Sequence, residues 1–148
     1  MSLQLKNRTK ELQACLLMLA CIENELTYSL AEIPTILSGL LNVDELLCLR
    51  FLKDTLELMR RGQPFKNAWE QAVRQSSQLF LPGDRDILLR LSGVLGASDA
   101  PSQIKELHAC RAMLEVQLKQ AREKAKTHGR LYQTIGVLGA VSVFIVLW

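Results

Sequence analysis

The fold of this chain is decided by residues 104–125, which read IKELHACRAMLEVQLKQAREKA. Apolar residues recur here at steps of seven, four, three and four, so an α-helix gathers them into one narrow stripe. The members of the stripe are Leu107, Leu114, Leu118, Ala121 and Ala125. No proline follows before Trp148, and we therefore predict one long helix with a single packing face.

A partner for this helix lies at the start of the chain. From Leu5 to about Tyr28 or Ser29, leucines form a stripe of similar width, and Lys and Glu occupy the other angles. We predict that this first amphipathic helix packs antiparallel to the long one. The stripe consists of Leu12, Leu16, Leu19 and Leu26.

Four shorter helices are predicted between these two. Capping residues, prolines in first turns and glycines after last turns set their limits. The apolar residues of the third helix cover much of its circumference, which predicts a central position. The helices run from a capping box at 29–32 to 38–39, from Asn42 or Asp44 to Gly62, from Pro64 to Pro82, and from about Asp84 to Leu95.

Composition supports an all-α fold. Apolar residues make up 49% of the chain but aromatic residues only 5%, whereas sheets favour aromatic and β-branched residues. The sequence therefore predicts an all-α, six-helix bundle whose long C-terminal helix runs into a transmembrane anchor. Residues 1–130 form a cytoplasmic helical domain in this prediction, and residues 131–148 form the transmembrane helix.

The anchor is indicated by 18 uncharged residues, 131–148, which would span about 27 Å as a helix against about 30 Å of hydrocarbon. A buried core helix is the alternative. Aromatic residues bracket the run, and Lys and Arg outnumber Glu just before it, as on a cytoplasmic flank. Gly136 and Ala140 form a small-x-x-x-small pair that would let another helix approach. The candidate membrane residues are Leu131, Tyr132, Ile135, Gly136, Gly139, Ala140, Phe144 and Trp148.

Several function classes find no support in the sequence. The net charge is only +3, which does not argue for a nucleic-acid binder. The four cysteines include no C-x-x-C pair, so a metal site is not expected, and the motifs of common enzymes and cofactor sites are missing. His108 and His128 are expected in solvent. We predict no catalytic residue, no cofactor and no metal.

Trp69 is the most individual side chain before the anchor. A buried anchor in a small bundle is the ordinary role for an isolated indole, and a partner-facing hot spot is the alternative. The stretch from Gly96 to Asp99 has two interpretations as well. A glycine stop followed by a Ser/Asp cap is what a tight turn between helices requires, but the same residues could contact a partner.

Four segments, taken in order, resemble the stage III sporulation protein AB family of endospore-forming bacteria. They are Glu25 to Tyr28, Ala68 to Ala72, Leu95 to Asp99 with Gln103, and Tyr132 to Gly139. The resemblance covers nearly the whole chain. Members usually have another membrane helix before the long amphipathic one, and Met1 lies where that helix should already have ended.

The resemblance implies a function without catalysis. The family's soluble domain is similar to the cytoplasmic domain of the type II secretion platform protein F. Its members are expected in the mother-cell membrane around the forespore, as adaptors that tie a secretion-type ATPase to other membrane subunits of a channel-like complex. Self-association is possible. The candidate partner-binding residues are Glu25, Tyr28, Trp69, Gly96, Ser98, Asp99 and Gln103. The alternative is a tail-anchored regulator that captures a partner's amphipathic helix in a groove.

Overall fold

The computed structural model describes the backbone of residues 3–29, 31–76, 80–95 and 100–137, and the side chains of 7–29, 31–76, 80–95 and 101–124. The described residues form six α-helices and one short 3-10 helix, and no strand occurs among them. The helices are α1 (Leu3–Tyr28), α2 (Ile33–Leu40), α3 (Arg50–Arg60), α4 (Phe65–Gln75), α5 (Pro82–Leu95) and α6 (Ala100–Val137), with η1 (Asp44–Leu46) before α3.

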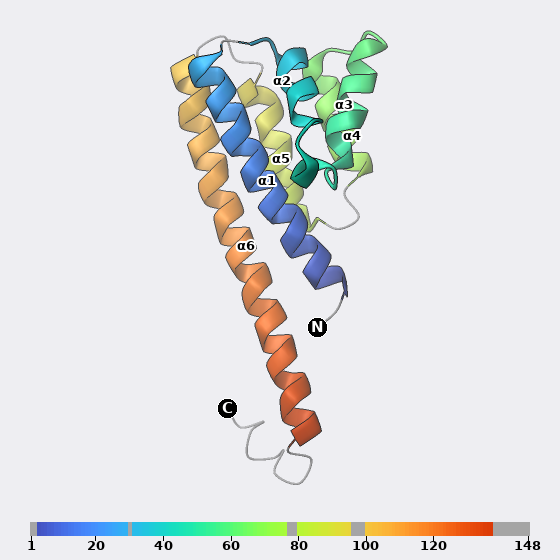
Figure 1. Ribbon diagram of the computed structural model, residues 1–148, viewed down its shortest axis with the longest axis vertical. Helices are drawn as coiled ribbons and strands as arrows, with labels where there is room; N and C mark the ends of the chain where they lie inside the picture. The colour runs from blue at the N-terminus through green and yellow to red at the C-terminus, as the bar shows by residue number, and fades with distance from the viewer. Residues whose placement is uncertain (1–2, 30, 77–79, 96–99, 138–148) are drawn as a thin grey trace.

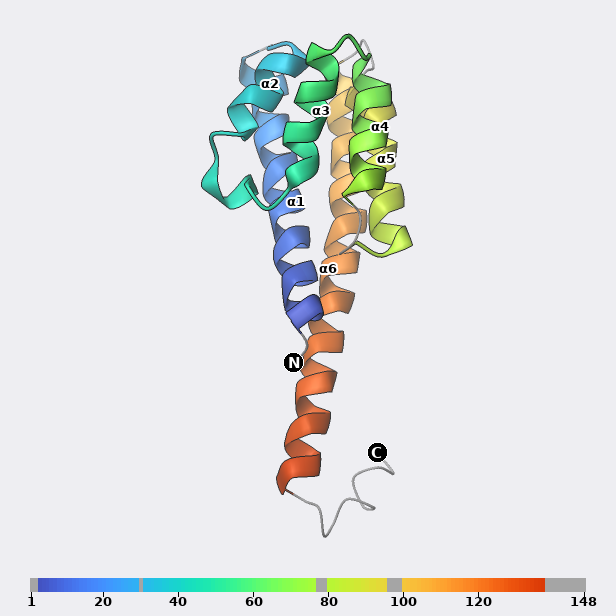
Figure 2. The ribbon, with the colours of Figure 1, turned by 90° about the vertical axis from the view of Figure 1, so that its right-hand side faces the viewer.

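The six helices form a ring in which each one packs mainly on its neighbours in the chain, and α6 closes the ring against α1. Figure 1 shows α1 and α6 running in opposite directions, with α6 reaching well beyond the other helices. Figure 2 shows the shorter helices α2 to α5 gathered at one end of this pair. The predicted antiparallel pairing of the first and last helices is confirmed.

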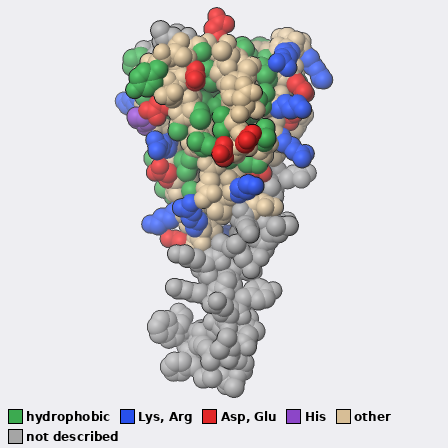
Figure 3. Space-filling view, viewed as in Figure 1, with side chains coloured by type: hydrophobic (Ala, Val, Ile, Leu, Met, Phe, Trp, Pro, Cys, Tyr) green, Lys and Arg blue, Asp and Glu red, His purple; other side chains and the backbone are tan. Residues whose placement is uncertain are grey.

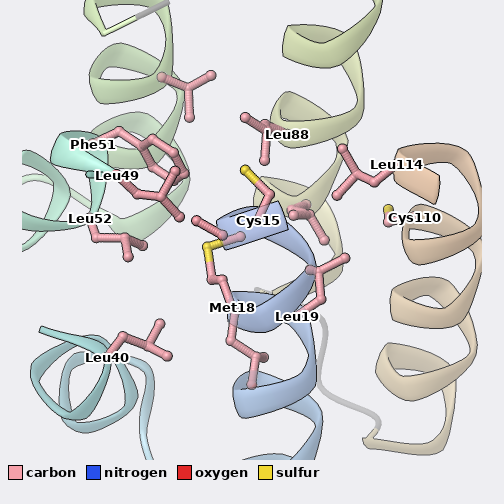
Figure 4. Packing of buried hydrophobic residues seen from close by; sticks show 14 of the residues in the cluster. Cys15, Met18, Leu19, Leu40, Leu49, Phe51, Leu52, Leu88, Cys110 and Leu114 are labelled. Atoms are coloured by element: carbon pink, nitrogen blue, oxygen red, sulfur yellow. The ribbon is translucent and has the colours of Figure 1, made fainter. Parts of the chain in front are cut away.

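The core is built around α1. Its residues Cys15, Met18 and Leu19 are buried, and Figure 4 shows them between α6 on one side and α2, α3 and α5 on the others. Every predicted stripe residue of α6 from Leu107 to Ala121 is buried as well. On α1 the predicted stripe residues Leu12, Leu19 and Leu26 are buried, and Leu16 is only partly buried. Burying a leucine side chain contributes about 1.5–3 kcal/mol, so both stripes stabilise the bundle.

Most predicted helix ends agree with the structure. Gly62 has a φ of 101°, which suits glycine, and it follows the end of α3. The Gly62 amide donates to the Met59 carbonyl at 3.0 Å and the Gln63 amide to the Leu58 carbonyl at 3.1 Å, the bond pair of a Schellman motif. Pro64 precedes α4 directly and has an extended ψ of 152°.

Two predictions about helix starts were wrong. The third helix does not begin at Asn42 or Asp44, because η1 and an irregular turn come first and α3 starts at Arg50. The turn lets the chain bury Leu46 and Leu49 while Leu47 stays 60% exposed. The capping box at 29–32 is also absent, because Glu32 caps α2 without a side-chain bond and the Ser29 hydroxyl donates to Glu25 instead.

The predicted anchor falls largely outside the described residues. Residues 131–137 form the last turns of α6, and Gly139, Ala140, Phe144 and Trp148 lie beyond the part of the chain that the structure describes. Within that part, no helix combines the length and apolarity that crossing a bilayer requires. The transmembrane helix therefore stays a prediction.

Candidate partner-binding surface

Several candidate residues are brought together at one end of the bundle. Because α1 and α6 are antiparallel, the end of α1 and the start of α6 lie at the same end, opposite the C-terminal end of α6 (Figure 1). We call this the distal end. Glu25 and Tyr28 belong to it through α1, and Gln103 belongs to it through α6.

Tyr28 is the aromatic side chain most available to a partner among the described residues, with 81% of its surface exposed. Glu25 lies one turn earlier on α1 and is half-buried. Its carboxylate accepts a hydrogen bond of 2.6 Å from the hydroxyl of Ser29. An exposed aromatic ring near a held carboxylate offers both apolar contact area and a directed charge to a docking protein.

A groove runs between α1 and α2 beside Glu25. It has a volume of about 350 Å³, and its wall on α1 is made by Cys21, Asn24 and Glu25. Ile36 and Leu40 of α2 are almost fully buried and line its floor. The other lining residues are Thr35, Gly39 and Val43.

Acidic groups dominate the electrostatics of the groove. Glu25 is the one charged residue among the described residues that line it. Burial raises the pKa of the Cys21 thiol, and the negative charges of Glu25 and Glu45 raise it further. The groove therefore has an apolar floor and a carboxylate, that of Glu25, in its wall.

Trp69 lies inside the bundle and has no exposed surface. Its indole Nε1–H donates to the Leu88 carbonyl at 2.7 Å, and its ring meets Phe51 edge-on with centroids 5.2 Å apart. Phe65 covers another side of the indole at 5.6 Å. In this fold Trp69 holds α3, α4 and α5 together, and its side chain does not reach a partner-facing surface.

Gln103 is also buried, and its amide group donates to the carbonyl of Leu95, the last residue of α5, at 3.2 Å. This bond satisfies a carbonyl that the helix end leaves without a partner in the helix. Gly96, Ser98 and Asp99 lie outside the described residues. The described geometry therefore leaves Glu25 and Tyr28 as the candidates that face solvent.

A buried polar cluster was not found by sequence reasoning. Asp84, with no exposed surface, accepts from Arg8 Nε at 2.9 Å, from Gln117 Nε2 at 2.6 Å and from the Leu81 amide at 2.9 Å. It links α1, α5 and α6. One signal was available, since Arg8 is placed four residues before Leu12, on the buried face of α1, where a cation needs a carboxylate partner.

A second hollow of about 540 Å³ lies near the start of α3 and is lined by Glu11, Arg50 and Asp54 among others. Burial raises the pKa of the Glu11 carboxyl. Arg50 and two carboxylates make this hollow polar, and nothing in it gives positive support to catalysis. No group of three His, Cys, Asp or Glu able to hold a metal occurs among the described residues.

Comparison with known proteins points to one family. The family model described as stage III sporulation protein AB matches residues 1–148, the whole chain. A solved structure of stage III sporulation protein AB (SpoIIIAB) is similar, with a TM-score of 0.66 and 19% sequence identity. The match covers 82% of this chain and 98% of the other, and at this identity it shows the fold. A search of curated proteins returned no match.

Proposed function

Since the chain belongs to the stage III sporulation protein AB family, we propose that it is a membrane-anchored adaptor of a secretion-like sporulation complex. It recruits a secretion-type ATPase on the mother-cell side and couples it to the membrane subunits that connect mother cell and forespore. In this proposal the protein performs no chemistry of its own. Its work is to hold two other components at a set distance and orientation.

The observation that carries this proposal is the two-ended shape of the molecule. At one end α6 continues beyond the rest of the bundle, and its exposed residues Lys119, Arg122 and Lys124 suit a membrane surface with anionic lipids. At the other end lie Tyr28 and Glu25, available to a cytoplasmic protein. An adaptor between a membrane and a soluble ATPase needs these two ends.

Membrane attachment is assigned to residues 131–148, which carry no charged side chain. In the proposed arrangement the bundle lies in the mother-cell cytoplasm, with the distal end facing away from the outer forespore membrane. The lysines and arginines before residue 131 agree with that orientation, because cytoplasmic flanks of membrane helices are enriched in them.

The anchor is tested by membrane fractionation of sporulating cells. The full chain should stay in the membrane pellet after an alkaline carbonate wash, and a chain ending at residue 130 should be released. Release of the full chain by the wash would mean that residues 131–148 do not span the bilayer.

The adaptor role is tested by measuring binding of the purified ATPase to the full chain in nanodiscs of neutral lipid. We expect saturable binding, and a loss of at least about tenfold on Tyr28→Ala, since exposed aromatic residues often dominate interface energies. Leu47→Ala is the matched control, because Leu47 is 60% exposed but follows η1 rather than ending α1. A folded chain that does not bind the ATPase would refute the adaptor role.

A regulator that captures a partner's whole amphipathic helix would need a long apolar cleft. Neither of the two hollows described above is apolar throughout, because one is lined by Glu11, Arg50 and Asp54 and the other has Glu25 in its wall. The family match favours a subunit of the sporulation complex over this alternative.

A further inference from the structure

The outward face of α1 from Gln13 to its C-terminal end is unusual for a surface helix because its exposed positions carry no charge. From Gln13 to Thr27 the exposed positions recur every three or four residues, and Tyr28 and Ser29 follow them, yet none of these residues is Lys, Arg, Asp or Glu. A solvated helix face ordinarily carries charged residues. Here Leu17 is 37% exposed and Tyr28 81% exposed. The exposed positions are Gln13, Leu17, Ala20, Asn24, Thr27, Tyr28 and Ser29.

The adjoining surface of α2 continues this uncharged face. Its exposed residues are Pro34, Thr35, Ser38 and Gly39. Figure 3 shows the side of the molecule that contains this face: hydrophobic and uncharged side chains with a few acidic ones lie over its centre and upper part, and Lys and Arg lie toward its sides and lower end. A protein that docks here therefore meets apolar surface and negative charge.

The groove between α1 and α2 is the concave part of this face. Its floor is apolar, and it opens beside Gly39, where an added Cβ atom would meet no heavy atom within 4 Å. The space over Gly39 is thus available to a side chain from outside the molecule.

The charge of the groove restricts what can fill it. Among the described lining residues Glu25 is the charged one, and the charges of Glu25 and Glu45 both act on the thiol of Cys21. An acidic segment would be repelled, and a purely apolar one would leave the half-buried Glu25 carboxylate with less water and no cation. A Lys or Arg beside an apolar side chain satisfies both parts of the groove.

We propose that the groove between α1 and α2 receives an apolar side chain from a docking segment of the ATPase, and that Glu25 pairs with a Lys or Arg next to it. This inference rests on the adaptor function proposed above and names its contact site. Charge-assisted hydrogen bonds between a carboxylate and a basic side chain are stronger than neutral ones, so Glu25 sets the preference for a basic segment.

The first test fills the groove without disturbing the fold. Gly39→Phe places a ring in the open space, and Gly93→Phe is the matched control, because Gly93 is also helical, exposed and free of atoms within 4 Å of an added Cβ. With the full chain in neutral nanodiscs, Gly39→Phe should weaken ATPase binding at least tenfold, and Gly93→Phe should leave it within twofold. Equal binding by both variants overturns the groove proposal but leaves the adaptor function standing.

The second test reverses the charge of Glu25. Glu25→Lys should weaken ATPase binding at least tenfold, and Glu25→Gln should weaken it by less than Glu25→Lys does. The control is Glu57→Lys, which changes an exposed carboxylate on α3 and should have little effect on binding. Circular dichroism spectra of the variants serve as the check that each of them is folded. The same loss with Glu57→Lys would mean that net charge rather than Glu25 controls docking.

A third measurement decides the groove chemistry even if the ATPase does not bind and the adaptor role fails. Two designed helical peptides of equal length, one of Leu and Lys and one of Leu and Glu, are titrated against the full chain in neutral nanodiscs. We expect saturable binding of the Leu/Lys peptide only, lost on Gly39→Phe. If both peptides bind alike, if neither binds, or if Gly39→Phe has no effect, the proposed chemistry is wrong.

Discussion

Arg8 and Asp84 form a two-point ion pair inside the bundle, with Nε to Oδ2 at 2.9 Å and Nη2 to Oδ1 at 3.0 Å. The two residues are 76 positions apart, and neither side chain is more than 6% exposed. Gln117 adds a third contact from α6. The start of α1 is thereby held to α5 and α6 at the end of the bundle from which α6 extends.

Replacing Asp84 with Asn is expected to destabilise the protein by about 3 kcal/mol or more, because Arg8 then stays buried without a counter-charge. The free energy of unfolding from urea titration measures this effect. Glu106→Gln is the control, since its pair with Arg90 is about half exposed and should change stability by only about 0–1 kcal/mol. Similar losses in both variants would contradict a special role for the buried pair.

The same carboxyl predicts a pH dependence. Burial alone would raise the pKa of Asp84, but hydrogen bonds from Arg8, Gln117 and the Leu81 amide, together with the charge of Arg8, outweigh burial and hold it below the ordinary value of 3.8. A carboxyl with a lowered pKa in the folded state stabilises the protein above its unfolded pKa. This stabilisation is lost as the pH falls below about 3.8 toward the folded value. Urea titrations at several pH values should show a smaller acid loss in Asp84→Asn than in the unchanged protein.

Trp69 is expected to affect stability rather than binding. Trp69→Ala should cost about 3–5 kcal/mol through the cavity that it leaves. Trp69→Phe keeps an aromatic ring against Phe51 but removes the indole hydrogen bond to the Leu88 carbonyl, at a cost of about 0.5–1.5 kcal/mol for the lost bond. Thermal unfolding measures both. If folded Trp69→Phe loses ATPase binding while Gly93→Phe retains it, then Trp69 also acts on the partner.

The four thiols should separate into two reactivity classes. Cys15 and Cys110 have no exposed surface, and Cys21 and Cys48 are partly exposed. Burial raises the pKa of all four thiols, that of Cys15 well above the ordinary value, so the two buried thiols should react with Ellman's reagent only after unfolding. The number of thiols labelled without urea, compared with the number labelled in urea, distinguishes the two classes.

The proposed docking groove makes a further prediction for thiol labelling in the presence of the ATPase. Bound ATPase should protect Cys21, which lines the groove, but not Cys48. Labelling of Cys48→Ser and Cys21→Ser variants assigns the protected thiol. Protection of Cys48 alone would instead place the partner at the second hollow, which Cys48 lines.

Helix stripes and helix ends were largely predictable, and the reasons can be seen at single residues. Gly62 ends α3 because its backbone conformation is one that glycine adopts without strain. The start of α3 was not predictable in the same way. Leu46, Leu47 and Leu49 read as part of one apolar helix, and only packing against α1 decides that Leu46 and Leu49 are buried in a turn while Leu47 is exposed.

The candidate surface was predictable only in part. Family resemblance pointed to Glu25 and Tyr28, which the fold leaves partly or largely exposed, but it pointed equally to Trp69 and Gln103, which the fold buries. The groove itself depends on how α2 lies across the end of α1. No residue pattern along either helix specifies that crossing.

By itself, the sequence determined the helical class, most helix ends and the pairing of the first and last helices, because hydrophobic periodicity and capping act over a few residues of the chain. Only the tertiary structure decided that Arg8 meets Asp84, that Trp69 lies inside the bundle and that Gly39 opens onto a groove beside Glu25. These relationships join residues that are distant along the chain. They arise from the packing of all six helices around one core, which local patterns do not encode.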